Sequence, residues 1–129
     1  MNRKVACYLM AVVLLATLFS CATFDKNAYS TLSTAKITYD TTLSALGDLQ
    51  RQGKISDADV QKIIKIANIY RTAYLAAVSA YEVYHNNPSV TNQDQLLQLL
   101  SDVSAALGQL IPLLAPYNIT VQPIVVPTK

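Results

Sequence analysis

The stretch "ISDADVQKIIKIANIYRTAYLAAVSAYEVYH", residues 55 to 85, sets the architecture of the chain. At its start, Ser56 can cap a helix, and Asp59, three residues later, can complete a capping box. Ile55 can pack on Val60 as a hydrophobic staple. Asp57 and Asp59 also place negative charge at the positive end of the helix dipole. These signals together predict a helix from about 57 to 86.

Apolar residues cover an unusually wide arc of this predicted helix. Alanines and isoleucines widen a stripe that consists of Val60, Ile63, Ile64, Ala67, Tyr70, Tyr74, Val78, Tyr81 and Tyr84. An arc of this width suits a helix that contacts two neighbours at once. We therefore expect the helix to lie at the centre of a bundle and to end before Pro88, where proline and two asparagines favour a turn.

Helical periodicity also appears on both sides of this segment. The earlier stretch has inward positions at spacings of three and four, namely Tyr29, Leu32, Ala35 or Lys36, Tyr39, Leu43, Leu46, and Leu49 or Gln50. It predicts a helix from about 27 to 52 that stops at Gly53, a residue suited to the left-handed cap. The later stretch predicts a helix over 92–111, capped by Thr91 to Asp94 and kinked or ended at Pro112.

Short turns between three such helices require them to run antiparallel in sequence order. The predicted fold is therefore all-α, an up-down-up three-helix bundle over residues 27–115. After it, residues 116–129 contain three prolines and a β-branched run, which predicts an extended tail.

The N-terminus has the layout of a secretory signal. Arg3 and Lys4 form a short cationic start, and an apolar run from Val5 to Phe19 leads to small residues. A helix of about 15 residues would be roughly 22 Å long, short of a hydrocarbon core of about 30 Å. We therefore expect a signal peptide over residues 1–20 rather than a membrane span, with an uncleaved signal anchor as the alternative.

Leu18-Phe19-Ser20-Cys21 resembles the lipobox of bacterial lipoproteins, with Phe19 bulkier than the usual residue. The resemblance implies cleavage between Ser20 and Cys21, a diacylglycerol (palmitate-type) anchor on the Cys21 thiol and a lipidated tether over 21–26. Ala22 after the cysteine implies the outer membrane, facing the periplasm, rather than the inner membrane. The alternatives are an unmodified core cysteine or a disulfide with Cys7, which cleavage would remove.

The remaining chain shows little sign of catalytic chemistry. With Arg3 and Lys4 set aside, eight basic and eight acidic side chains remain and are scattered, which argues against a nucleic-acid partner. Glu82 and the single histidine, His85, lie three residues apart, too few for a metal site, and are better explained as a solvated helix end. We expect a protein that is not an enzyme and that has no metal and no cofactor besides the covalent lipid.

Two features could bind a partner. The first is the tyrosine stripe Tyr70, Tyr74, Tyr81 and Tyr84, although such a stripe is more often core with hydroxyl groups that reach the rim. The second is the set of apolar tail residues Ile119, Val121, Ile124 and Val126, which could cover the bundle as a lid or join a partner's sheet.

The expected function is a lipid-anchored interaction or scaffold protein of the cell envelope with a protein partner of unknown identity. The alternative is a bundle that binds a small apolar ligand or lipid between its helices.

Overall fold

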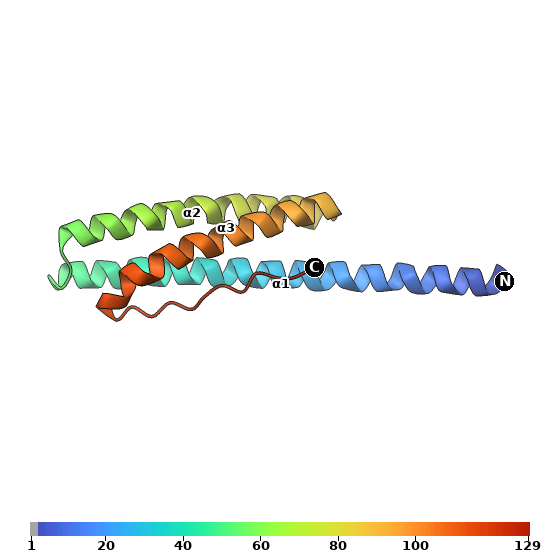
Figure 1. Cartoon of the computed structure of the whole chain (residues 1–129), viewed down its shortest axis with the longest axis horizontal. Coiled ribbons are helices and arrows are strands. Elements are labelled where there is room, and N and C mark those ends of the chain that lie inside the picture. The colour runs from blue at the N-terminus through green and yellow to red at the C-terminus, as the bar shows by residue number, and fades with distance from the viewer. Residues whose placement is uncertain (1–2) are drawn as a thin grey trace.

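The structure is a computed structural model that describes the backbone from Arg3 to Lys129 and the side chains from Ala22 onward. It contains three α-helices, α1 (Arg3–Arg51), α2 (Asp57–Asn86) and α3 (Val90–Leu114), followed by the 3₁₀ helix η1 (Ala115–Tyr117) (Figure 1). Short turns join the helices, which run up, down and up. The predicted all-α three-helix bundle is confirmed.

Helix α2 has the bounds that the sequence predicts. Ser56 is its N-cap, with extended backbone, and its Oγ accepts a hydrogen bond from the Asp59 backbone N–H at 3.2 Å. The same hydroxyl donates to Asp59 Oδ2 at 2.9 Å. Ile55 and Val60 are both buried, as a hydrophobic staple requires. Local capping chemistry alone therefore fixes where α2 begins.

Helix α1 begins well before the predicted residue 27 and ends at Arg51. The stretch from Ala22 to Lys26, predicted as a tether, is helical, and Phe24 in it is only 3% exposed. Phe24 lies four residues before Ala28, which in turn lies four before Leu32, so it extends the buried stripe by another turn. The tether prediction is therefore wrong for residues 22–26, because core packing reaches back to Phe24.

The buried face of α1 also differs from the predicted one in detail. Leu32, Ala35 and Leu46 are buried as expected, whereas Tyr29 and Leu43 are exposed and Thr31 and Thr42 take buried positions. At the end of the helix, Gly53 has a φ of +66°, the left-handed conformation that the sequence predicts. The Lys54 N–H donates to the Leu49 carbonyl at 2.9 Å and closes the turn.

Helix α3 is longer than the predicted 92–111 at both ends. Ser89, not Thr91, is the N-cap, and its Oγ accepts from the Asn92 N–H at 3.1 Å. Pro112 lies inside the helix and does not end it. Proline removes one backbone hydrogen bond, but burial of Leu110 and Leu114 on either side keeps the last turn helical.

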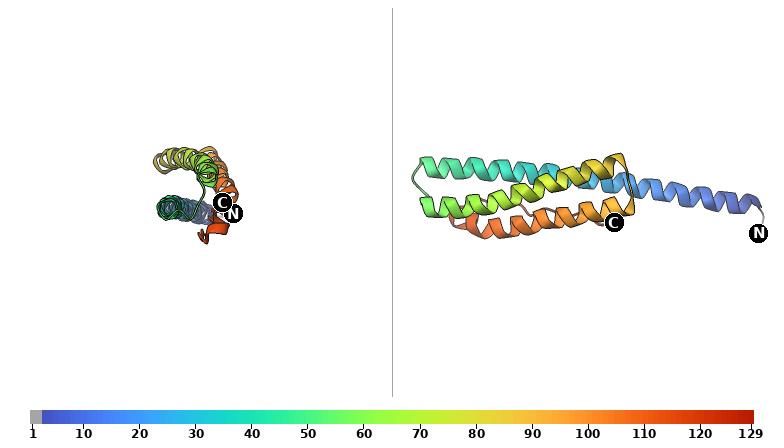
Figure 2. Two further views of the ribbon diagram at one scale, coloured as in Figure 1. Left: turned by 90° about the vertical axis from the view of Figure 1, so that its left-hand side faces the viewer. Right: turned by 90° about the horizontal axis from the view of Figure 1, so that it is seen from above.

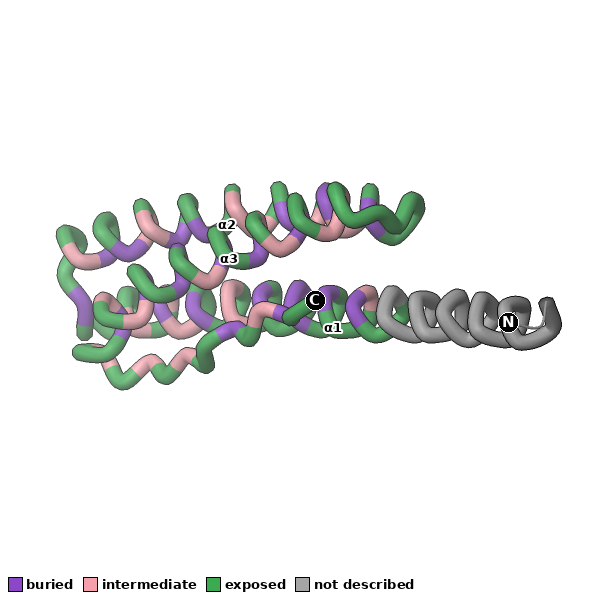
Figure 3. The backbone as a smooth tube through the Cα atoms, turned by 45° about the vertical axis from the view of Figure 1, so that its right-hand side comes forward, coloured by how far each residue is buried: buried purple, intermediate pink, exposed green. Residues whose placement is uncertain are grey.

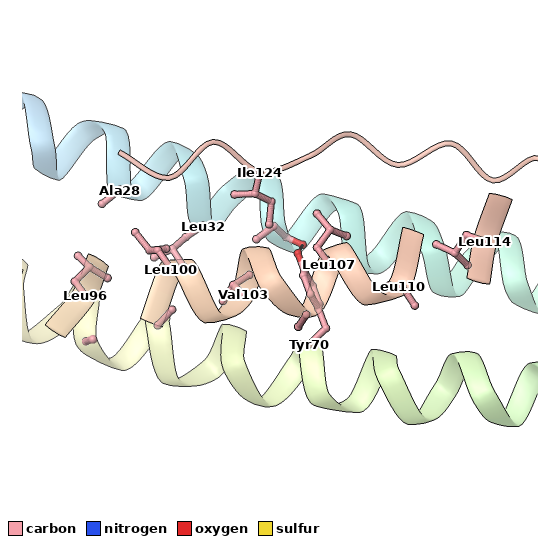
Figure 4. Close-up of a cluster of buried hydrophobic side chains, with 14 of the residues drawn as sticks. Ala28, Leu32, Tyr70, Leu96, Leu100, Val103, Leu107, Leu110, Leu114 and Ile124 are labelled. Atoms are coloured by element: carbon pink, nitrogen blue, oxygen red, sulfur yellow. Dashed lines mark hydrogen bonds between the residues drawn. The ribbon is translucent and has the colours of Figure 1, made fainter. Parts of the chain in front are cut away.

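The core lies between the facing sides of the three helices (Figures 3 and 4). Helix α2 is central, as predicted, since it packs extensively on α3 and also on α1, whereas α1 and α3 have little direct contact. The largest fully buried side chains come from α2 and α3, and they are Tyr70, Tyr84, Ile63, Leu96, Leu100, Leu107, Leu110, Leu114 and Val103. The seam between α1 and α3 therefore needs another element to close it.

The C-terminal tail is that element. After η1, which takes residues 116 and 117 out of the predicted extended segment, Asn118 adopts a left-handed turn with φ 57°. The chain then runs back alongside α1 and α3 without regular secondary structure (Figures 1 and 2). Ile124 points from the tail into the core (Figure 4) and is 6% exposed. The prediction of an extended tail is confirmed from Ile119 onward.

The spacing of the buried tail residues shows what kind of extended chain this is. Ile124 and Pro127 are buried and Val121 is half-buried, so inward positions recur every third residue. Three residues per turn is the period of polyproline II, whereas a strand would bury every second residue. The tail therefore covers the bundle through side chains, with no sheet needed.

Ile124→Ala and Val125→Ala form a matched pair, because the two residues are neighbours with opposite environments. Ile124 is 6% exposed and Val125 is 80% exposed. We expect Ile124→Ala to lower the free energy of unfolding by about 2 to 4 kcal/mol, as for other buried aliphatic side chains. Val125→Ala should change it by less than about 0.5 kcal/mol. Urea titration followed by circular dichroism measures both, and equal effects would show that the tail is not packed.

Candidate functional site

The predicted anchor itself, Ser20 and Cys21 with the signal peptide 1–20, lies outside the residues whose side chains the structure describes. The described chain next to it is firmly attached to the bundle. The ring of Phe24 meets that of Tyr84 edge-on, with centroids 5.0 Å apart and planes at 77°. Asp25 Oδ1 lies 2.9 Å from His85 Nδ1. Lipidation of Cys21 stays a prediction, but the position of the segment that follows it is defined.

Two members of the predicted tyrosine stripe belong to the core. Tyr70 and Tyr84 are buried, so they cannot contact a partner on the folded bundle. The Tyr70 hydroxyl donates to the Ala35 carbonyl at 2.8 Å, and its ring stacks on Tyr39 with centroids 5.9 Å apart. Burial raises the pKa of Tyr70 far above its usual value. The reading of Tyr70 and Tyr84 as interaction residues is therefore corrected.

The other two members, Tyr74 and Tyr81, are half-buried and reach the surface. Tyr81 contacts Tyr29 of α1, with ring centroids 6.1 Å apart, and His85, at 5.7 Å. Burial, together with the nearby Asp25 carboxylate, raises the pKa of Tyr81. The helical periodicity predicts an inward position for Tyr29, whereas Tyr29 is 63% exposed and extends the aromatic surface of Tyr81 onto α1.

Both pairs of tyrosines belong to rows with a seven-residue spacing. Ile63, Tyr70, Ala77 and Tyr84 follow one another at intervals of seven, and all four are buried. The second row is Val60, Ala67, Tyr74 and Tyr81, of which the first two are buried and the two tyrosines half-buried. A repeat of seven keeps one edge of a helix facing its partner, so the spacing indicates core positions for both rows and does not tell the two pairs of tyrosines apart.

The predicted tail residues act within the chain. Ile124 is buried, and Ile119, Val121 and Val126 are half-buried and packed against the core. The Thr31 hydroxyl donates to the Val125 carbonyl at 2.9 Å, and Lys129 pairs with Asp94 of α3. This is the arrangement of a lid. For the tail to join a partner's sheet, these contacts would first have to break.

A polar contact that the sequence did not indicate fixes the start of the tail. The Tyr117 hydroxyl donates a hydrogen bond to Asp59 Oδ2 at 2.7 Å, although the two residues are far apart in the sequence. This hydrogen bond and the one from Ser56 lower the pKa of Asp59, and the same contact raises the pKa of Tyr117. Asp59 thus holds both the helix cap of α2 and the tail, a second role that no local pattern shows.

A shallow groove of about 220 Å³ lies between α1 and the tail. No charged side chain lines it, and its residues are Thr34, Ile37, Thr38, Thr41, Thr42, Thr120, Val121 and Gln122. Thr42 is buried, and within the described part of the chain its hydroxyl has no hydrogen-bond partner. The threonines of the groove place hydroxyl groups beside the apolar side chains of Ile37 and Val121.

Glu82 and His85 do not form a site together. Both are exposed, and the histidine pairs with Asp25 across to α1. Among the residues that the structure describes, His, Cys, Asp and Glu do not gather in groups of three that could hold a metal ion. The absence of metal, cofactor and enzymatic activity stays a prediction.

Within the described chain, only the segment Val90–Tyr117 is long and apolar enough to cross a membrane. It comprises α3 and η1, and seven buried residues of α3 give it a place in the core.

Comparison with known proteins adds no family, because no protein family, curated protein or solved structure matches the chain.

Tyr70→Phe and Tyr74→Phe test whether the buried hydroxyl stabilises the fold. Each removes one oxygen, but only the Tyr70 hydroxyl hydrogen-bonds to a carbonyl in the core. We expect Tyr70→Phe to lower the free energy of unfolding by about 1 kcal/mol. Tyr74→Phe should lower it by less than about 0.5 kcal/mol. Chemical denaturation of both variants gives the comparison, and a larger loss in Tyr74→Phe would contradict the assignment.

The contact between Tyr117 and Asp59 predicts a pH dependence. The folded state lowers the pKa of Asp59, so the contact stabilises the protein above the ordinary carboxyl pKa. This stabilisation is lost as the pH falls through the lowered value. We therefore expect the wild type to be more stable than Tyr117→Phe at neutral pH, with the difference shrinking below about pH 4.

Unfolding curves of the two proteins between pH 2 and pH 7 measure this difference. A difference that stays constant across the range would contradict the role of the Asp59 carboxylate.

Proposed function

We propose that the protein is a non-enzymatic, lipid-anchored interaction or scaffold protein of the bacterial cell envelope. The observation that carries the proposal is the sequence around Leu18-Phe19-Ser20-Cys21, with its cationic and apolar lead. In the proposed mature protein, which begins at Cys21, buried Phe24 would be the fourth residue.

The proposed location is the outer membrane, with the bundle facing the periplasm. Ala22 follows the cysteine where an aspartate would imply retention in the inner membrane. In this arrangement the acyl chains hold the protein on the membrane, because two or three chains bind a bilayer stably whereas one does so only marginally.

The partner-binding role is supported by what the bundle exposes. Ile37 and Tyr29 of α1 are each 63% exposed among serines and threonines, and half-buried Tyr81 of α2 adjoins Tyr29. Exposed aromatic and aliphatic side chains on an otherwise polar surface are typical of protein interfaces. We assign the outward face of α1, with Tyr29 and Ile37, as the surface for a protein partner.

The alternative functions differ in what they require. A binder of small apolar ligands needs a cavity that encloses the ligand, and the groove between α1 and the tail is shallow, with five threonines beside Ile37 and Val121. An uncleaved signal anchor needs residues 1–20 to remain on the protein in the membrane. The mass of the intact protein distinguishes an uncleaved signal anchor from a cleaved, lipidated protein.

Intact-mass measurement of protein extracted from membranes tests the anchor. We expect wild-type protein to begin at Cys21 and to carry acyl mass, and Cys21→Ser to remain an uncleaved, unacylated precursor. Cys7→Ser is the matched control, because that residue lies in the predicted signal peptide and its loss should leave processing unchanged.

Normal acylation and membrane retention of Cys21→Ser would refute the proposed anchor. Wild-type protein that retains residues 1–20 without acyl mass would establish the signal anchor instead.

A further inference from the structure

The distance between the proposed anchor and the folded core is very short. Phe24 is buried, and it is the third residue after Cys21. Three residues span at most about 11 Å even when fully extended. A lipid on Cys21 would therefore hold the end of the bundle next to the membrane surface, without the long flexible linker that would let a domain move away from it.

The end of the bundle near Cys21 is rigid. Phe24 packs on Tyr84, and Asp25 pairs with His85, so the first described turn of α1 is fixed to the last turn of α2. The turn from α2 to α3 is closed by hydrogen bonds as well, since the Asn92 side chain donates to the Asn87 carbonyl at 2.7 Å. The chain next to the anchor and the α2–α3 turn thus form one unit.

The composition of this end suits contact with lipid headgroups. Residues 86–91, Asn-Asn-Pro-Ser-Val-Thr, carry no charge, and Val90 is 70% exposed. The charged groups around the turn have mixed signs, with Lys26 beside Asp25, Glu82 exposed on α2, and Lys129 paired with Asp94. Because this turn is neutral and exposes a valine, no charge has to leave water when the turn contacts the bilayer. The contact therefore does not require anionic lipid.

We propose that the bundle stands end-on upon the membrane, with the α2–α3 turn, residues 86–91, in contact with the lipid headgroups. The proposal rests on the lipid anchor of the proposed function and adds an orientation to it. Helix α2, at 30 residues, is about 45 Å long, so the α1–α2 turn lies about that far from the bilayer. The outward face of α1 then stands upright in the periplasm, accessible to a partner from the side.

Site-specific quenching tests this orientation in the lipidated protein. The expected acylation of Cys21 leaves the mature chain without a free thiol, so Val90→Cys and Gln52→Cys each introduce a unique labelling site at opposite ends of the bundle. Each variant is labelled with a fluorophore and reconstituted into phosphatidylethanolamine and phosphatidylglycerol vesicles that contain lipid with a nitroxide headgroup. We expect at least threefold stronger quenching at position 90 than at position 52.

A variant with a flexible linker tests whether the short tether causes the end-on orientation. An insertion of 20 glycine and serine residues between Thr23 and Phe24 gives the bundle a reach of roughly 25 Å, which frees it from a fixed orientation. Quenching at position 90 should fall to near the level at position 52. Persistent strong quenching in this variant would overturn the short tether as the cause of the orientation.

Flotation of the vesicles and intact mass separate the two possible failures. Protein that carries no acyl mass and does not float with the vesicles contradicts the proposed anchor. Acylated protein that floats but is quenched equally at positions 52 and 90 overturns only the end-on orientation.

Discussion

Helices α1 and α3 make little direct contact, so the three helices alone do not close the core. Helix α2 packs on both neighbours, but α1 and α3 meet so little that their seam would expose apolar side chains. The tail closes this seam with Ile124 and is held at three points along its length, by Tyr117 on Asp59, Val125 on Thr31 and Lys129 on Asp94. The core is therefore formed by three helices and, as a fourth element, the non-helical tail.

This use of the tail determines which surfaces remain for function. Because Ile124 is buried, the apolar tail is not free to recruit a partner while the bundle is folded. The surfaces that remain include the outward face of α1, with Tyr29 and Ile37, and the neutral end of the bundle that adjoins the proposed anchor, and α2 also exposes Ile69, Leu75 and Val83. The direction of the tail also brings Lys129 to Asp94 near that end, so the C-terminus and the residues next to the proposed anchor both lie close to the membrane in the proposed orientation.

Local signals in the sequence predict helices well and long-range packing poorly. Ser56, Asp59 and Gly53 act on their own neighbours, so the start of α2 and the end of α1 follow from the sequence within a residue. The helical start before residue 27 and the continuation of α3 through Pro112 depend on burial of Phe24 and Leu114 against other elements, which no local pattern reveals. The separation of Tyr70 and Tyr84 from Tyr74 and Tyr81 could not have been predicted from spacing, because both pairs lie on rows of apolar residues seven apart. The contact between Tyr117 and Asp59 is likewise shown by no local pattern.

Hydrogen exchange measured with and without the tail tests the central claim that the tail completes the core. The comparison is between the whole chain and a chain that ends at Asn118, which keeps η1 and the Tyr117 contact with Asp59. We expect amides of α1 between Thr31 and Thr42, and amides in the second half of α3, to exchange much faster in the shortened chain. Unchanged protection in both segments, together with an unchanged free energy of unfolding, would show that the tail does not complete the core.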